Sequence, residues 1–134
     1  MKWIDYESPK SLDEAAGLLS QNPGKARMLA GGTDLLVDLR GGRHLIDLVV
    51  DGKEIPELTG VEWDSQAGLT IGAATPCYKI YGSDIVQNRY PGLVDSASLI
   101  GGTQIQGRAS FGGNLCNAAP SGDSIPAMIV HNAT

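Results

Sequence analysis

Cysteine is scarce in this sequence, and its two copies, Cys77 and Cys116, lie far apart along the chain. No C-x-x-C pair is present, and His44 and His131 are the only histidines. The residue spacing of a zinc site is therefore missing, and so is the framework of paired cysteines found in small secreted domains. Two free thiols are typical of a reducing compartment, so we expect a cytoplasmic protein.

Positive charge and long apolar runs are also lacking. Ten Lys and Arg stand against 15 Asp and Glu, which gives a formal net charge of -5. The basic surface that nucleic acid or an anionic membrane requires is missing, so we expect neither partner. No apolar run reaches the length of about 18 residues that a membrane span needs, and the N-terminal segment has no signal-peptide core.

Glycine, by contrast, is abundant. It accounts for 18 of 134 residues, whereas an average content of ~7% would give about half as many. Four pairs stand at the edges of apolar segments: Gly31-Gly32, Gly41-Gly42, Gly101-Gly102 and Gly112-Gly113. Such pairs mark sharp turns or close approach of two backbones. The length suits one domain or part of a larger one, and 42% hydrophobic residues can form a core.

The first part of the sequence alternates helical and strand patterns. Ser11 followed three residues later by Glu14 is a capping-box pattern, which marks the start of a helix. We predict, in order, a helix from residue 12 to the Asn-Pro-Gly turn at 22–24, a strand at 26–30, a short helix capped by Thr33, and a strand at 44–48.

The second part begins with a different pattern. Two short apolar segments with a turn between them predict a β-hairpin within residues 60–73. Pro76 suits the first position of a helix that Thr75 caps, and a further helix is expected from about Tyr90 to the residue before Gly101. The fold class is therefore mixed α and β.

The glycine-rich segments pose the question of anion binding. Between Leu99 and Gly122 the only charged side chain is that of Arg108, so an anion bound there would be held mainly by main-chain N–H groups. The G-x-G-x-x-G pattern does not occur, and the nearest match to a Walker A loop lacks its Lys and its Ser or Thr. Spacing alone leaves two interpretations equally open: tight turns in a β-rich domain, or a nucleotide site of a non-Rossmann type.

Two segments favour the nucleotide site. "AGGTDLL" (30–36) follows an apolar strand and opens a helix, which directs several N–H groups to one place. "SFGGN" (110–114) offers a hydroxyl, two glycines and an amide within five residues, with no bulky group over the glycines.

Three segments in the same order closely resemble signatures of the FAD-binding subunit of molybdenum hydroxylases: "LAGGTDLL" (29–36), "LTIGAAT" (69–75) and "QIQGRASFGGNLCNAAPSGD" (104–123). That family includes the medium chain of aerobic carbon monoxide dehydrogenase and the flavin domain of xanthine dehydrogenase. The resemblance implies an α+β fold of the vanillyl-alcohol-oxidase (PCMH) type. Residues 1–56 would form a small α/β subdomain, and residues 57–134 the start of an antiparallel-sheet subdomain, with FAD between them.

The resemblance also implies which residues bind FAD. Positions on both glycine turns would face the pyrophosphate, Ala74, Ile100 and Gly101 would lie along the cofactor, and Asp123 would be near its hydroxyl groups. The full set is Arg27, Met28, Leu29, Ala30, Gly31, Gly32, Thr33, Asp34, Leu35, Ala74, Ile100, Gly101, Ser110, Gly113, Asn114 and Asp123.

Simpler structural roles remain open for several of these residues. Thr33 and Asp123 are also suited to capping a helix, Asp34 to interacting with a helix dipole, and Asn114 to a left-handed turn. Cys116 is expected to be a small buried side chain.

The sequence departs from the family pattern in two ways. Gln106-Gly107 replaces a frequent Arg-Asn pair, whereas Ser110 keeps the hydroxyl of the usual Thr. A complete family subunit is also much longer, so the chain is expected to be an N-terminal fragment or a truncated product, inactive alone and able to form a homo-oligomer.

The function that the resemblance implies is electron relay in a flavoprotein oxidoreductase. A large molybdenum-cofactor subunit and a small [2Fe–2S] subunit would be partners, and FAD would pass electrons to an acceptor. No catalytic acid, base, nucleophile or metal ligand is identified in this chain, because the cofactor carries the redox chemistry. Two alternatives are an FAD-free structural or assembly module, and a flavin domain of a related oxidase without molybdenum partners.

Overall fold

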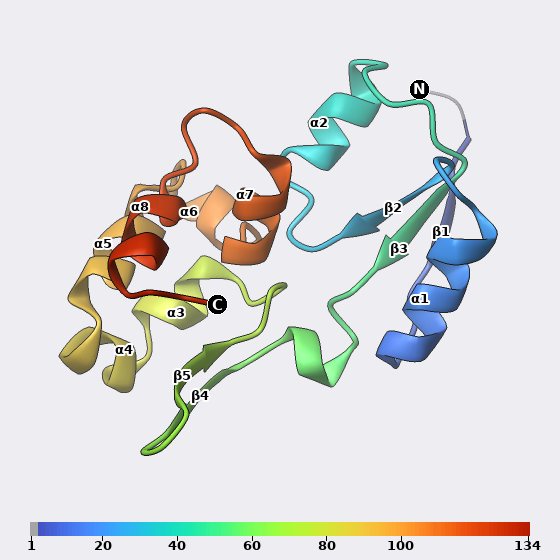
Figure 1. The fold of residues 1–134 in the computed structure, drawn as a ribbon. Coiled ribbons are helices and arrows are strands. Elements are labelled where there is room, and N and C mark those ends of the chain that lie inside the picture. Colours follow the sequence, from blue (N-terminus) through green and yellow to red (C-terminus); the bar gives the residue numbers. More distant parts are fainter. Residues whose placement is uncertain (1–2) are drawn as a thin grey trace.

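A three-stranded parallel sheet lies in the N-terminal part of the chain (Figure 1). The computed structural model describes residues 3–134. The strand order is β1-β3-β2, and both outer strands run parallel to the central β3. The elements of this part are β1 (Asp5–Glu7), α1 (Leu12–Gln21), β2 (Ala26–Leu29), α2 (Leu35–Arg40), β3 (Leu48–Asp51) and a 3-10 turn, η1 (Pro56–Leu58).

The central strand is buried along its whole length because the two helices cover opposite faces of the sheet. Leu48 and Val50 pack with Ala15 of α1, whereas Val49 packs with Leu39 of α2. This alternation follows from the two-residue period of a strand. The prediction of a strand at 44–48 was wrong, since β3 begins only at Leu48. The run Leu-Val-Val suits a position with both faces covered.

Helix α1 begins as the capping pattern predicts. The Oγ atom of Ser11 accepts a hydrogen bond from the N–H of Glu14 at 3.2 Å. The Glu14 carboxylate accepts in return from the N–H of Lys10 at 2.9 Å, one residue before the usual partner. Helix α1 and strand β2 are confirmed close to their predicted positions.

The second part of the chain starts with the predicted hairpin, formed by β4 (Val61–Asp64) and β5 (Gly68–Ile71). Asp64 closes its turn, because Oδ1 accepts hydrogen bonds from the N–H groups of Gln66 and Ala67 at 2.7 and 2.8 Å. These two bonds hold the pKa of the Asp64 carboxyl below its usual value.

Six short helices follow the hairpin and form their own core. They are α3 (Cys77–Tyr81), α4 (Asp84–Arg89), α5 (Pro91–Leu99), α6 (Thr103–Gln106), α7 (Phe111–Asn117) and α8 (Ser124–Val130). Ile80, Val86, Leu93, Ala97 and Phe111 are buried together in this core. The predicted helix near residues 90–100 is confirmed as α5.

The predicted cap of α3 was wrong by one residue. Pro76, and not Thr75, occupies the N-cap position. The buried hydroxyl of Thr75 instead donates to the carbonyl of Gly60 at 2.9 Å and accepts from the N–H of Gly60 at 2.8 Å. The two hydrogen bonds of Thr75 therefore connect the residue before the hairpin to the segment that leads into α3.

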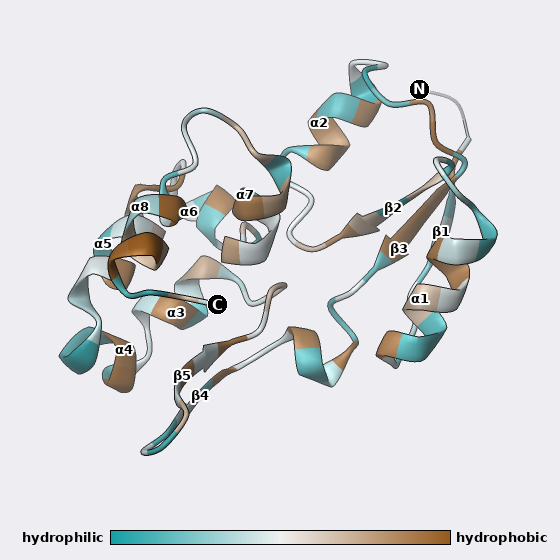
Figure 2. Ribbon diagram, viewed as in Figure 1, coloured by the Kyte–Doolittle hydropathy of each residue, from teal (hydrophilic) through white to brown (hydrophobic). Residues whose placement is uncertain are grey.

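Hydrophobic residues also reach the surface, and Figure 2 shows α8 as strongly hydrophobic. Ile129 and Val130 on this helix are 71% and 81% exposed. Within residues 3–134, no helix combines the length and apolar character needed to cross a bilayer. The same residues contain no group of three or more His, Cys, Asp or Glu placed to hold a metal ion.

Candidate cofactor site

A cavity of about 570 Å³ lies where the parallel sheet meets the helical part of the chain. Its walls come from α1, from the segment after β2, from Ala73 and Ala74, from Ile100, and from α7 with the residues before it. It brings together most of the residues that the resemblance implies: Arg27, Met28, Leu29, Ala30, Gly31, Gly32, Thr33, Asp34, Leu35, Ala74, Ile100, Ser110, Gly113 and Asn114.

Two glycines allow these distant segments to meet backbone against backbone. A Cβ atom on Gly31 would lie 2.1 Å from the carbonyl oxygen of Arg108, and one on Gly112 would lie 2.5 Å from the carbonyl oxygen of Ala73. The N–H of Gly112 also donates to that Ala73 carbonyl at 3.1 Å. Any side chain at either position would push the walls of the cavity apart.

The turn after β2 presents main-chain donors to the cavity. Gly32 has a φ of +80°, which is the left-handed region. Among the described residues, the N–H groups of Gly31 and Gly32 have no backbone acceptor. The predicted capping role of Thr33 was wrong: Asp34 occupies the N-cap position of α2, and it makes no side-chain capping bond.

The second predicted cradle, residues 110–114, is the first turn of helix α7. The Oγ atom of Ser110 caps this helix, since it accepts from the N–H of Gly113 at 3.1 Å. Asn114 therefore has helical backbone, and the left-handed alternative for it was wrong; that conformation belongs to Ala118, with a φ of 52°.

The side chain of Asn114 links α7 to α8. Its Oδ1 atom accepts from the hydroxyl of Ser124 at 2.7 Å and from the N–H of Ser124 at 3.3 Å. Asn114 thus supplies a bond at the start of α8, where a capping role had been left open for Asp123. Asp123 stands at the N-cap position but makes no side-chain bond there.

Two of the implied residues do not line the cavity. Asp123 lies at the start of α8, and Gly101 forms a turn with a φ of +56°, where its added Cβ would lie 3.0 Å from Ile105. Their contacts with a cofactor therefore rest on the resemblance alone.

The two cysteines have opposite environments. Cys77 is buried, and burial raises the pKa of its thiol to about 11. The expectation that Cys116 is buried was wrong, since its side chain is exposed and lines the cavity. Its position on α7, one turn after the glycine pair, places it there.

Several lining residues were not anticipated from the sequence. They are Leu12, Ala15, Ala16 and Leu19 of α1, together with Asp38, His44, Leu58, Ala73, Ala109, Gly112 and Asn117. On α1 the same apolar face serves both the core and the cavity, so its pattern alone could not separate the two roles. The sequence does contain one signal for Gly112 as a lining residue, namely its place in the Gly112-Gly113 pair.

Charged side chains around the cavity do not favour an anion by themselves. The charged groups among the lining residues are the guanidinium of Arg27 and the carboxylates of Asp34 and Asp38, so negative charge outnumbers positive charge there. An anionic group in this cavity would therefore depend on main-chain N–H groups, which helix starts and turns provide.

Comparison with known proteins identifies the class. The family model described as the FAD binding domain in molybdopterin dehydrogenase matches residues 2–134. The chain belongs to this family, and FAD is the cofactor that the family binds.

Particular relatives agree with the family assignment. The chain is 37% identical over 131 residues to the xanthine dehydrogenase FAD-binding subunit of Escherichia coli O157:H7, covering 98% of this chain and 44% of that subunit. It is 38% identical over 131 residues to the carbon monoxide dehydrogenase medium chain of Hydrogenophaga pseudoflava, covering 95% and 44%. The chain thus spans less than half the length of these relatives.

A solved structure confirms the fold. The Cu,Mo-CO dehydrogenase in its cyanide-inactivated form matches with a TM-score of 0.88 and 31% identity, covering 96% of this chain and 44% of that chain. The predicted α+β class and FAD-binding fold are therefore confirmed.

The residues present fit FAD. The cavity volume lies within the range of about 300–1,000 Å³ that is usual for cofactor sites. Apolar side chains of α1 and Leu58 line the cavity, and so do Gly31 and Gly32, whose N–H groups have no backbone acceptor among the described residues. This combination suits a ligand with flat apolar rings and a charged pyrophosphate.

Proposed function

We propose that the chain is the FAD-binding part of a molybdenum hydroxylase-type oxidoreductase and relays electrons from iron-sulfur clusters, through FAD, to an acceptor. When bound, FAD supplies the redox chemistry. The protein supplies binding and orientation. The observation that carries the proposal is the cavity in which the Gly31-Gly32 turn, Ala74 and the first turn of α7 converge.

The proposed binding roles follow the geometry of that cavity. The backbone from Ala30 to Asp34 and the start of α7 at Ser110–Asn114 would face the pyrophosphate. Ala74 and Ile100 would contact the apolar parts of the cofactor, because both are buried side chains at its wall. Asp123 would bond to ribityl or ribose hydroxyls, and Gly101 would lie along the cofactor, as the resemblance implies.

The proposed partners are a large molybdenum-cofactor subunit and a small [2Fe–2S] subunit. The names of the relatives, FAD-binding subunit and medium chain, support an assembly of several chains. Within this chain we propose a boundary near residue 56 between the two parts of the FAD-binding fold. We also propose a cytoplasmic location.

The test uses the thiol that lines the cavity. FAD is expected to slow the alkylation of Cys116 by iodoacetamide, because it would cover the exposed side chain. Cys77 is expected to stay unmodified in the folded chain with or without FAD, because burial keeps its thiol protonated.

A matched control separates coverage from a general effect of FAD on the reagent. Ser98 is exposed on α5 and does not line the cavity. In a Ser98→Cys chain, the rate at the new thiol should not depend on FAD. Equal rates at Cys116 with and without FAD, in a folded and colourless chain, would exclude the cofactor site and favour the FAD-free module.

A further inference from the structure

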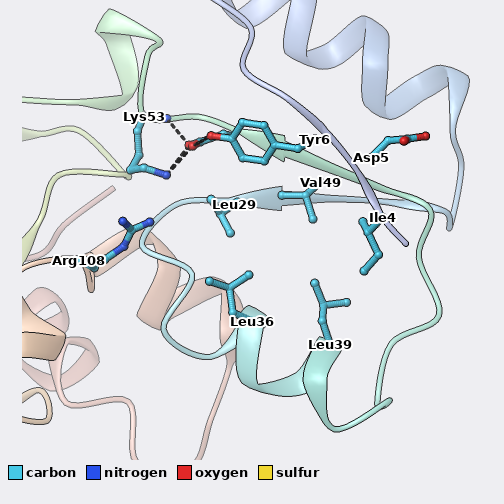
Figure 3. Close-up of a pocket in the computed structure, with 10 residues that line it drawn as sticks. Ile4, Asp5, Tyr6, Leu29, Leu36, Leu39, Val49, Lys53 and Arg108 are labelled. Atoms are coloured by element: carbon cyan, nitrogen blue, oxygen red, sulfur yellow. Dashed lines mark hydrogen bonds and ion pairs between the residues drawn. The ribbon is translucent and has the colours of Figure 1, made fainter. Parts of the chain in front are cut away.

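A second cavity, of about 260 Å³, lies behind the turn that lines the cofactor cavity. Figure 3 shows it between the sheet and α2, with apolar side chains on its walls. One end is polar and holds Tyr6, Asp51, Lys53 and Arg108. None of these four residues lines the cofactor cavity. Tyr6, the pair Asp51 and Lys53, and Arg108 come from three segments far apart in the sequence.

Two cations at this end reach two consecutive carbonyl groups of the turn. The Nε atom of Arg108 donates to the carbonyl of Gly31 at 3.1 Å. The Nζ atom of Lys53 lies 3.4 Å from the carbonyl of Ala30, which is longer than a usual hydrogen bond and therefore mainly an electrostatic contact.

The position of Lys53 is itself fixed. Its ammonium group contacts both carboxylate oxygens of Asp51, at 2.6 and 2.7 Å. The hydroxyl of Tyr6 donates to the same carboxylate, which is buried (Figure 3). Lys53 is thus held in place against the turn.

The direction of these carbonyls sets the direction of the next N–H groups. In a trans peptide the C=O and the N–H point in opposite directions, and the described chain contains no cis peptide. When the carbonyls of Ala30 and Gly31 point to Lys53 and Arg108, the N–H groups of Gly31 and Gly32 point away from them. Gly32 itself has a positive φ of +80°, and a residue of this kind next to one in the right-handed region is part of the backbone arrangement in which successive N–H groups form an anion-binding concavity.

We propose that Lys53 and Arg108 are positioning residues for the cofactor. They hold the turn from behind, so that the N–H groups of Gly31 and Gly32 are already directed at the pyrophosphate before FAD binds. The inference rests on the proposed function for the identity of its ligand. The order of the turn, however, is a property of the chain without any ligand. Such preorganisation lowers the cost of binding.

The first measurement needs no cofactor. We expect 15N order parameters of about 0.85 for the Gly31 and Gly32 amides in the unaltered chain, and below about 0.6 in Arg108→Met. Lys53→Met should give a smaller decrease because its contact is longer. Arg40→Met is the matched control, since Arg40 is exposed at the end of α2 and lines neither cavity. Unchanged order of both amides in Arg108→Met, with the fold intact by circular dichroism, would overturn the proposal.

The second measurement titrates ADP, which carries the same pyrophosphate, while the two amides are observed. Arg108→Met is expected to weaken ADP binding about tenfold. Arg108→Lys should be weakened nearly as much, because lysine keeps the charge but has no Nε–H donor at that place. Binding by Arg108→Lys equal to that of the unaltered chain would show that only charge matters and contradict the positioning role.

The two measurements also separate this inference from the proposed function. If ADP shifts neither amide in the unaltered chain, the cofactor site is wrong. The order parameters would still decide whether Lys53 and Arg108 hold the turn.

Discussion

Gly31 is the glycine at which the backbones of the two parts of the chain approach most closely, next to the carbonyl of Arg108. A side chain there would overlap the carbonyl of Arg108, a backbone group that cannot rotate away. We expect Gly31→Ala to lower the free energy of unfolding by about 2–3 kcal/mol, in the range of overpacking changes. Urea denaturation measures this, and FAD binding should be lost as well.

Gly17 provides the matched control for that change. It lies within α1, and an added Cβ there would meet no atom within 4 Å. Gly17→Ala should therefore raise stability by ~0.5–1 kcal/mol, because alanine favours the helix. Equal effects of the two substitutions would show that the close approach at Gly31 is not a constraint.

Asp51 gives the chain a dependence of stability on pH. Burial by itself raises the pKa of this carboxyl, but hydrogen bonds from Lys53 and Tyr6 outweigh that effect and lower the pKa below its usual value. The stabilisation is therefore present above the unfolded pKa of about 3.9 and is lost as the pH falls through the lower folded pKa. The bond to Asp51 raises the pKa of Tyr6, so its contribution is present below about pH 10 and is lost above it.

We expect Tyr6→Phe to make the loss of stability below about pH 4 less steep, because the Asp51 pKa then lies closer to its unfolded value. The same variant should lose stability less on raising the pH above about 10. Thermal unfolding followed across both pH ranges measures the two effects. Identical profiles for Tyr6→Phe and the unaltered chain would mean that the Tyr6–Asp51 bond does not contribute.

Among the secondary-structure elements, α8 has its first residue hydrogen-bonded to a side chain of the neighbouring helix α7. Asn114 of α7 provides the acceptor for the N–H and hydroxyl of Ser124, whereas Asp123 makes no capping bond. Asn114→Ala should cost about 1 kcal/mol of stability, as the loss of a cap does. Asp123→Ala should change stability by less than about 0.5 kcal/mol.

The two variants also distinguish structure from binding at Asp123. If Asp123 contacts the cofactor, Asp123→Ala lowers FAD affinity while its urea midpoint stays near that of the unaltered chain. A large loss of stability in Asp123→Ala, with none in Asn114→Ala, would reverse the assignment of the cap.

The molecule as a whole exposes features that favour association with another chain. Helix α8 carries the exposed Ile129 and Val130, and the β4–β5 hairpin is a sheet of only two strands among the described residues. Open strand edges and exposed apolar side chains invite pairing. We expect the 134-residue chain to self-associate, with a mass by light scattering that rises above 14.0 kDa as concentration increases.

Replacement of Ile129 and Val130 by Lys should shift that equilibrium toward the monomer. Leu45→Lys, on an equally exposed residue far along the chain from α8, is the control and should leave association unchanged. A mass of 14.0 kDa at every concentration for the unaltered chain would contradict the expectation.

The sequence by itself determined the features that depend on neighbouring residues. The capping box at Ser11, the hairpin within 60–73 and the helix after Tyr90 are local patterns, and each is present in the structure. The order of three glycine-containing segments was sufficient to indicate the family, because each segment keeps the small residues that a close backbone contact needs.

Only the tertiary structure decided which partners these residues have. Thr75 bonds to Gly60 and Asn114 to Ser124, so neither side chain acts within its own turn. Strand β3 packs against α1 on one face of the sheet and against α2 on the other, and local pattern does not specify these partners. The contact of Arg108 with Gly31 joins residues far apart in the sequence. A hydrogen bond of this kind depends on where the folded chain brings two groups together, and no local pattern encodes that distance.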